Sequence, residues 1–302
     1  MSLTSLLKER GSPLRATFRD LLPDAPRFVT ALNRELGSHP LNTPRPPDPA
    51  LSGTALDYRL RYMLVTMRSQ ETVASAGALR MLLALKRPPV EAALVRYFKD
   101  LDGIVGGFDP VGQLLSDEHE RLLAAHCVVL AYCEQFFRSG RSRLFDVASS
   151  SGTLPTDLLT LAPAETVADV MSVSRSFFDR QYSALSGRLV LANPTFDGSR
   201  DVSGADADIV AGDSLVDFKS TIQDRPIEGD DLYQLLGYVC LDYSDKYRIR
   251  RAGFSLLRRD VLLEWDLASL VLKLSGGRTT LSLLKERIRS AIDGAGLAPT
   301  RD

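Results

Sequence analysis

The sequence predicts an α/β protein with a mainly helical N-terminal domain, residues 1–150, and a second domain, residues 151–302, built on a mixed central sheet. Apolar residues recur at helical spacing through most of the first half, whereas short apolar runs with alternating polar positions follow residue 187. A serine-, glycine- and proline-rich break at residues 139–163 separates the two regions. With 302 residues, 44% of them hydrophobic, the chain is long enough for two domains and apolar enough for a packed core.

Helical spacing of apolar residues marks most of the N-terminal half. It first covers residues 14–36, and a proline-rich connector at residues 39–53 is expected to be extended. Helices are expected again at residues 55–66, 72–86, 90–101 and 117–138. His119, His126 and Cys133 recur every seven residues on the last of these. Two helical turns separate neighbours, too far for one ion, so a packed helix face is the better interpretation.

The C-terminal half alternates strands with helices. Pro163 is well placed to begin a helix that runs to about residue 185. Asp230 or Asp231 is expected to cap a second helix, which runs to about residue 243. Strands are expected at residues 188–196, 207–211, 214–220, 248–257 and 261–265, the last two joined by a turn at residues 259–260.

Residues 204–238 contain the side chains with the clearest chemistry. Asp208 begins an apolar run, and Asp217 and Lys219 alternate with apolar residues in the next run, so these two share one strand face. A hairpin brings Asp208 towards that face. Two neighbouring carboxylates repel each other unless a cation lies between them, and oxygen ligands suit Mg²⁺ or Mn²⁺. Lys219 is then placed to orient a water molecule or to neutralise charge on phosphorus oxygens.

Five residues in this order resemble a known family. Asp208, the tripeptide Asp217-Phe218-Lys219, and Gln234 and Tyr238 in the sequence YQLLGY are similar to the motifs of the PD-(D/E)xK nuclease superfamily. Aspartate occupies the second acid position, where glutamate is commoner. The last two residues resemble the QxxxY motif of its RecB-like and lambda-exonuclease-like branch. The resemblance covers residues 164–265 and implies an αβββαβ core.

The resemblance implies a metal-dependent nuclease that hydrolyses phosphodiester bonds, with DNA the expected substrate by analogy with that branch. Asp208, Asp217 and the backbone carbonyl of Phe218 would bind Mg²⁺ or Mn²⁺. Lys219 would position water and stabilise the pentavalent phosphorus, and Gln234 and Tyr238 would hold Lys219 or a substrate phosphate.

Other acids remain open as metal ligands. Asp206 is a weaker rival to Asp208, because it precedes the apolar strand. The resemblance implies, for some members, an acid from the preceding helix, and Glu165, Asp169 and Asp179 are not ranked.

Two other functions remain open. One is a catalytically inactive nuclease-fold scaffold that binds nucleic acid or protein, and the other is a helical interaction protein whose N-terminal half carries the function. For a nuclease, the N-terminal helices are expected to guide substrate or bind a protein partner.

The charge balance excludes a globally basic nucleic-acid binder, because the formal net charge is −1. Any contact with nucleic acid must be local. Six basic residues without an intervening acid occur between residues 246 and 259, and Lys246, Arg248 and Arg250 are expected to follow phosphates beside the metal site. The alternative is an edge strand that charge protects against aggregation.

Three cysteines give no disulfide framework, which fits a reducing cytoplasm. An iron-sulfur cluster, found in some RecB-like nucleases, needs four cysteines and is not expected. No apolar run is long enough to span a bilayer, and the first residues lack the apolar core of a signal peptide, so no membrane partner is expected.

Overall fold

The computed structural model describes residues 2–294, which form two compact units. The first unit contains residues 2–40 and 185–294, and the second contains residues 41–184. The expected boundary at residue 150 is therefore misplaced. Residues 2–40 pack with the sheet, and residues 151–184 pack with the helices.

The first unit is built on a five-stranded mixed sheet with strand order β1-β2-β3-β4-β5. Its strands are β1 (Val190–Ala192), β2 (Ile209–Ala211), β3 (Ser214–Lys219), β4 (Arg251–Leu256) and β5 (Val261–Asp266). All neighbouring strands are antiparallel except β3 and β4, which are parallel. Parallel neighbours need a crossover, and α11 (Gly229–Leu241) supplies it. The predicted α/β class and mixed sheet are confirmed, and so is the order helix, three strands, helix, strand.

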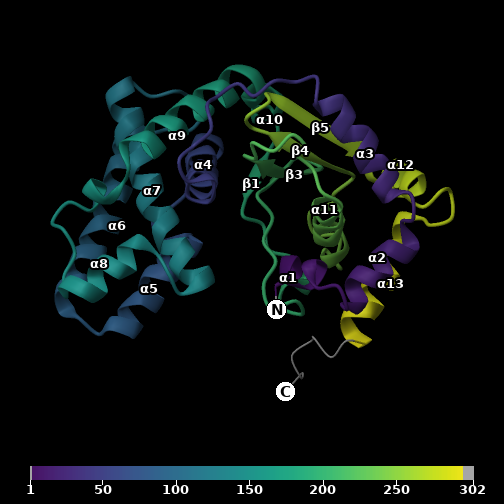
Figure 1. The fold of residues 1–302 in the computed structure, drawn as a ribbon, viewed down its shortest axis with the longest axis horizontal. Helices are drawn as coiled ribbons and strands as arrows, with labels where there is room; N and C mark the ends of the chain where they lie inside the picture. Colours follow the sequence, from purple (N-terminus) through teal and green to yellow (C-terminus); the bar gives the residue numbers. More distant parts are fainter. Residues whose placement is uncertain (1, 295–302) are drawn as a thin grey trace. The chain divides into compact units, whose positions relative to one another are not determined.

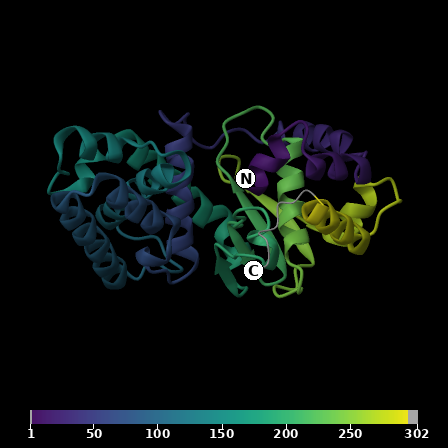
Figure 2. The same cartoon turned by 90° about the horizontal axis from the view of Figure 1, so that it is seen from below.

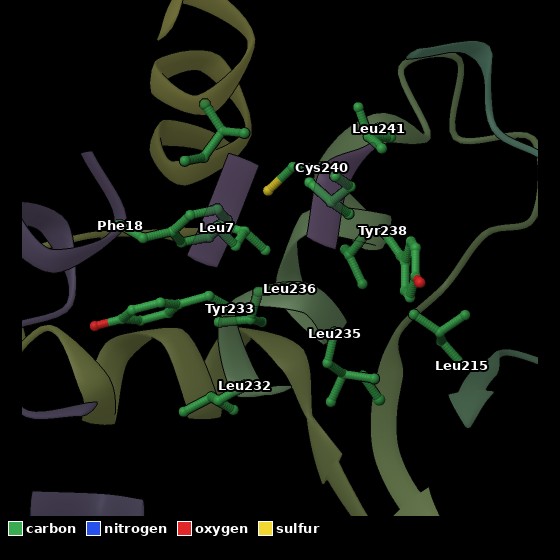
Figure 3. Close-up of a cluster of buried hydrophobic side chains, with 14 of the residues drawn as sticks. Leu7, Phe18, Leu215, Leu232, Tyr233, Leu235, Leu236, Tyr238, Cys240 and Leu241 are labelled. Carbon is green, nitrogen blue, oxygen red and sulfur yellow. The ribbon is translucent and has the colours of Figure 1, made fainter. Parts of the chain in front are cut away.

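One face of the sheet packs against α11 (Figure 1). Leu215 and Val210 are cross-strand partners and therefore share a face, and Phe254 of β4 belongs to the same buried cluster. Leu232, Leu235, Leu236 and Val239 of α11 belong to this cluster too. Figure 3 shows Tyr238 and Leu235 of α11 near Leu215. A buried helix that is apolar on most sides is expected where a sheet and further helices surround it.

Helices from both ends of the chain enclose the rest of α11 (Figures 1 and 2). They are α1 (Leu3–Lys8), α2 (Pro13–Leu21), α3 (Ala25–Leu36) and α13 (Leu281–Gly294), and α12 (Leu267–Leu274) packs on β5 and α13. Phe18 of α2 stacks on Tyr233 of α11 at 5.2 Å between ring centroids, as Figure 3 shows. Residues 14–36, expected as one helical stretch, are two helices, because Pro23 interrupts the backbone hydrogen bonding between α2 and α3.

The second unit is helical. Its helices are α4 (Pro49–Leu64), α5 (Val73–Leu85), α6 (Pro88–Phe108), α7 (Asp117–Ser139), α8 (Arg143–Ser151) and α9 (Ala164–Phe177). A π-helical turn, η3 (Phe178–Tyr182), and α10 (Ser183–Ser186) continue from α9. Two 3-10 segments of this unit are η1 (Ser69–Glu71) and η2 (Leu158–Leu161), and a third, η4 (Asp197–Ser199), lies in the first unit.

Two expectations for the loops of this unit are wrong. The connector expected to be extended to residue 53 becomes helical at Pro49, because the Asp48 side chain accepts bonds from the first backbone amides of α4 and proline fits the first helical position. The break at residues 139–163 contains α8, capped by Ser142 and packed on α7. Helix α9 packs on α4 and α7, which places it in this unit.

Among residues 2–294, the helices lack the combination of length and apolar character that crossing a membrane requires.

Candidate functional site

Asp208 and Asp217 meet across two antiparallel strands. Ile209 pairs with Val216, and continuing this register by one residue places Asp208 opposite Asp217. Directly opposed side chains lie on the same face of a sheet. The backbone amide of Phe218 donates a hydrogen bond to Asp208 Oδ2 at 2.6 Å, which ties the first acid to the strand that bears the second. The two predicted acids are thus brought together.

Lys219 lies beside Asp217 on the same face, as the alternation of β3 predicts. Its Nζ is 3.0 Å from Asp217 Oδ2 and 2.7 Å from Asp231 Oδ1 of α11. The ammonium also lies 5.8 Å from the centroid of the Phe254 ring, on the neighbouring strand. Contacts from two strands and one helix therefore fix the position of Lys219.

Burial controls the charges of this pair. The Asp217 side chain is 9% exposed and that of Lys219 is 18% exposed. Burial raises the pKa of Asp217, although Lys219 opposes the shift. The pKa of Lys219 is raised because the attraction of Asp217 and Asp231 outweighs the opposing effect of burial. Lys219 is therefore a fixed ammonium at neutral pH, not a proton acceptor.

Gln234 and Tyr238 join the acids from α11. Gln234 Nε2 donates to the Tyr238 hydroxyl at 2.6 Å, as four-residue spacing on one helix face allows. The pKa of Tyr238 is raised, first by burial and then by the negative charges of Asp217, Asp208 and Asp206. Tyr238 is therefore a neutral hydroxyl close to the acids. All five predicted residues belong to one cluster.

A pocket of about 270 Å³ reaches this cluster. Lys219, Asp231 and Gln234 line it on one side. The other lining residues come from α1, from the loop after β3 and from the first turn of α11: Thr4, Leu7, Lys8, Thr221, Gln223, Pro226, Glu228 and Asp230. The lining includes Lys219 and Gln234 but neither Asp208 nor Asp217, and Asp217 is buried.

Asp231 is a member of the site that the sequence marks only as a helix cap. It occupies the third position of α11, and its Oδ2 accepts a hydrogen bond from the backbone amide of Glu228, the residue that caps the helix. Its Oδ1 accepts from Lys219. The spacing of three residues from Gln234 puts both on one helix face, and this signal was present in the sequence.

Side chains from distant segments hold the loop that follows Lys219. Asn33 of α3 donates to the carbonyl of Ile227 at 2.7 Å and accepts from its amide at 3.1 Å. Arg258 donates to the carbonyl of Ser220, and Arg259 donates to that of Gln223, both at 2.8 Å. The pocket wall is therefore pinned to α3 and to the β4–β5 turn.

The three residues expected to follow phosphates lie in the loop before β4. Lys246, Arg248 and Arg250 precede β4, and the amide of Arg250 bonds to the carbonyl of Asp213 at the start of β3. The Lys246 ammonium lies 3.1 Å from the Tyr247 hydroxyl, which donates to the carbonyl of Thr195 at 2.8 Å, and Thr195 pairs with Asp206. The expectation that these three residues lie in a strand is wrong, because β4 begins only at Arg251. Their contact with phosphates stays a prediction.

Further acids lie around or outside the cluster. Asp206, which pairs with Thr195 in an isolated bridge, is close enough for its charge to raise the pKa of Tyr238. Glu165 and Asp169 on α9 and Asp179 on η3 belong to the second unit. Within residues 2–294, no group of three or more His, Cys, Asp or Glu side chains is arranged to hold a metal ion. Asp206, Asp208 and Asp217 are the acids whose charges act on Tyr238.

The seven-residue series on α7 forms a helix face, as expected. His119 stacks on Phe108 at 3.9 Å between ring centroids, and His126 packs against Tyr97 at 5.4 Å. Cys133 is fully buried.

Comparisons with models of protein families, with curated proteins and with solved structures found no match to this chain.

Proposed function

We propose that the protein is a metal-dependent nuclease that hydrolyses phosphodiester bonds, and that DNA is its substrate. One observation carries the proposal: Asp208, one residue before β2, accepts the amide of Phe218, the residue after Asp217, and the Lys219 ammonium lies 3.0 Å from Asp217. The order of elements and the position of Gln234 and Tyr238 on the crossover helix also support the PD-(D/E)xK resemblance. DNA is favoured over RNA by analogy with the resembled branch.

The acids suit a divalent cation. Asp217 Oδ2 is buried and forms no directed hydrogen bond, and the nearby ammonium is its ion-pair partner. A cation beside such an oxygen would offset the burial that raises the pKa of Asp217. Asp208, Asp217 and the carbonyl of Phe218 would hold Mg²⁺ or Mn²⁺, which characteristically bind one or two carboxylates and keep several waters. The bound ion would supply a water of lowered pKa and would polarise the scissile phosphate.

The remaining side chains have distinct tasks. Lys219 stays protonated, so it would stabilise the negative charge that develops on the phosphorus oxygens. Gln234 lines the pocket, so its side chain would contact the substrate phosphate. The hydrogen bond to the Tyr238 hydroxyl would keep the Gln234 amide in the required orientation. A nucleic acid is the proposed partner. The helical unit would guide substrate or bind a protein.

A second function has one observation in its favour. Asp217 is 9% exposed, and the pocket lining includes neither strand acid. A nuclease-like scaffold that binds nucleic acid or protein without turnover would tolerate acids at this depth. Catalysis, in contrast, requires that a phosphate and a metal reach both acids.

Cleavage assays separate these functions. Linear duplex, circular duplex and single-stranded DNA, together with RNA of the same sequence, would be incubated with the protein in Mn²⁺, in Mg²⁺ and in chelator. We expect cleavage of DNA that depends on the metal and is lost in Asp217→Asn and Lys219→Met. Asp213→Asn removes an exposed acid from the β2–β3 turn that pairs with Arg251 outside the site, and it should cleave like the parent. Equal cleavage by all four proteins would assign the activity to a contaminant.

A further inference from the structure

Lys219 is shared between carboxylates from two different elements. Asp217 on β3 lies 3.0 Å from its Nζ, and Asp231 on α11 lies 2.7 Å from it. The Asp231 side chain is 23% exposed at the pocket, whereas that of Asp217 is 9% exposed. The ammonium therefore lies between a buried acid and one that borders the pocket.

The contact of Lys219 with Asp231 allows Asp217 to bind a cation without losing the ammonium from the site. A divalent cation and an ammonium at one carboxylate are like charges at close range, and they repel each other. If Asp217 were the sole partner of Lys219, a cation would have to displace the ammonium from the site. Asp231 offers the ammonium another counter-charge within the same contact distance.

Asp231 is itself fixed, so it can fix Lys219. Its Oδ2 accepts the amide of Glu228 at 2.7 Å, and its Oδ1 faces Lys219. One carboxylate thus connects the first turn of α11 to the end of β3. Burial of Leu232 next to it keeps this turn packed in the core.

We propose that Asp231 is a positioning residue that holds the Lys219 ammonium at the pocket, so that the Asp217 carboxylate can accept a divalent cation. The cation in this inference rests on the proposed nuclease function. The ion pairs of Lys219 with Asp217 and Asp231 are seen directly in the structure. The effect of Asp231 passes through Lys219.

The chain offers matched variants. Asp231→Asn keeps an oxygen that can accept the Glu228 amide but removes the charge. Asp231→Glu restores the charge. Asp230→Asn removes the neighbouring charge, which pairs with Arg15 at 2.9 Å. Each of these would be made in the parent and in a Lys219→Met background.

Urea denaturation without metal tests the positioning. We expect Asp231→Asn to lower the midpoint in the parent and to have a smaller effect in the Lys219→Met background, because its partner is then absent. Equal effects in both backgrounds would overturn the inference. If Lys219→Met does not fold, the midpoint of Asp231→Glu should stay near that of the parent while that of Asp231→Asn is lower. A midpoint of Asp231→Glu as low as that of Asp231→Asn would overturn the inference.

Calorimetric titration with Mn²⁺ alone tests the consequence. We expect Asp231→Asn to weaken Mn²⁺ binding by about three- to tenfold in the parent, and by less in the Lys219→Met background. Asp230→Asn measures the general loss of one negative charge and should change the affinity less. Unchanged Mn²⁺ affinity in Asp231→Asn would overturn the inference. Absence of Mn²⁺ binding by the parent would refute the proposed function and the claim that Asp217 accepts a cation. The urea denaturation of the single and double variants would still decide whether Asp231 positions Lys219.

Discussion

His126 gives a quantitative prediction for stability against pH. It lies on α7 with 3% of its surface exposed, and neither ring nitrogen has a hydrogen-bond partner among the described residues. Burial lowers its pKa from 6.5 to about 4, although the charges of Asp157 and Asp100 oppose the shift. The folded protein therefore keeps this imidazole neutral under conditions in which an unfolded chain would protonate it.

The sign follows from proton uptake. Between pH 6.5 and about pH 4, the unfolded chain binds a proton at His126 that the folded chain does not, so acidification favours unfolding. The contribution of neutral His126 to the free energy of unfolding is fully present above pH 6.5 and is lost as the pH falls from 6.5 to about 4. At about 1.36 kcal/mol per pH unit, the loss is about 2 kcal/mol by pH 5 and about 3 kcal/mol in total.

Urea denaturation at pH 8 and pH 5, followed by far-UV circular dichroism, measures this loss. The parent should lose about 2 kcal/mol more than His126→Leu over the interval, because leucine cannot titrate. The packing change in the variant is the same at both pH values and cancels. His119→Gln, which alters the exposed histidine of the same helix, should behave like the parent. The same pH dependence in parent and His126→Leu would refute the reasoning.

Two further predictions concern close packing and the pocket loop. A Cβ on Gly77 of α5 would lie 2.0 Å from a backbone oxygen of α7, so Gly77→Ala should destabilise the protein by about 1–3 kcal/mol or more. Gly103 on α6 has open space around it, so Gly103→Ala should stabilise the protein by about 0.5–1 kcal/mol. Equal melting temperatures of Gly77→Ala and Gly103→Ala would contradict the close contact between α5 and α7. Asn33→Ala leaves both backbone groups of Ile227 unpaired beside the pocket and should lower stability by about 1–3 kcal/mol and raise KM. Thr30→Ala, whose hydroxyl bonds within its own helix, is the control, and the same loss in both variants would contradict the role of the loop contact.

Local patterns predicted much of the site. Alternation along β3 placed Asp217 and Lys219 on one face, and the four-residue spacing of Gln234 and Tyr238 placed both on one face of α11. Such signals depend on neighbours in the sequence. The helical start at Pro49 depends on neighbours too, since Asp48 before proline is a capping signal that the proline-rich composition of the connector outweighed.

Long-range contacts could not be predicted from these patterns. Asn33 bonds to Ile227 across 194 residues, and Phe18 stacks on Tyr233, so residues 2–40 complete the unit that contains the sheet. Nothing local in residues 2–40 distinguishes this packing from a place in the helical unit. The strand expected from residue 248 begins only at Arg251, because residues 246–250 form a loop whose Lys246 and Tyr247 amides bond to the Asp242 side chain.

The proposed nuclease site is tested most directly by the rate at which Asp217→Asn cleaves linear duplex DNA in Mn²⁺, compared with the rates of the parent and of Asp213→Asn. A carboxylate that holds the catalytic cation between two strands predicts a loss of at least about a hundredfold in Asp217→Asn, with the Asp213→Asn control at the parent rate. Cleavage by Asp217→Asn at the parent rate, with its fold intact by circular dichroism, would contradict the assignment.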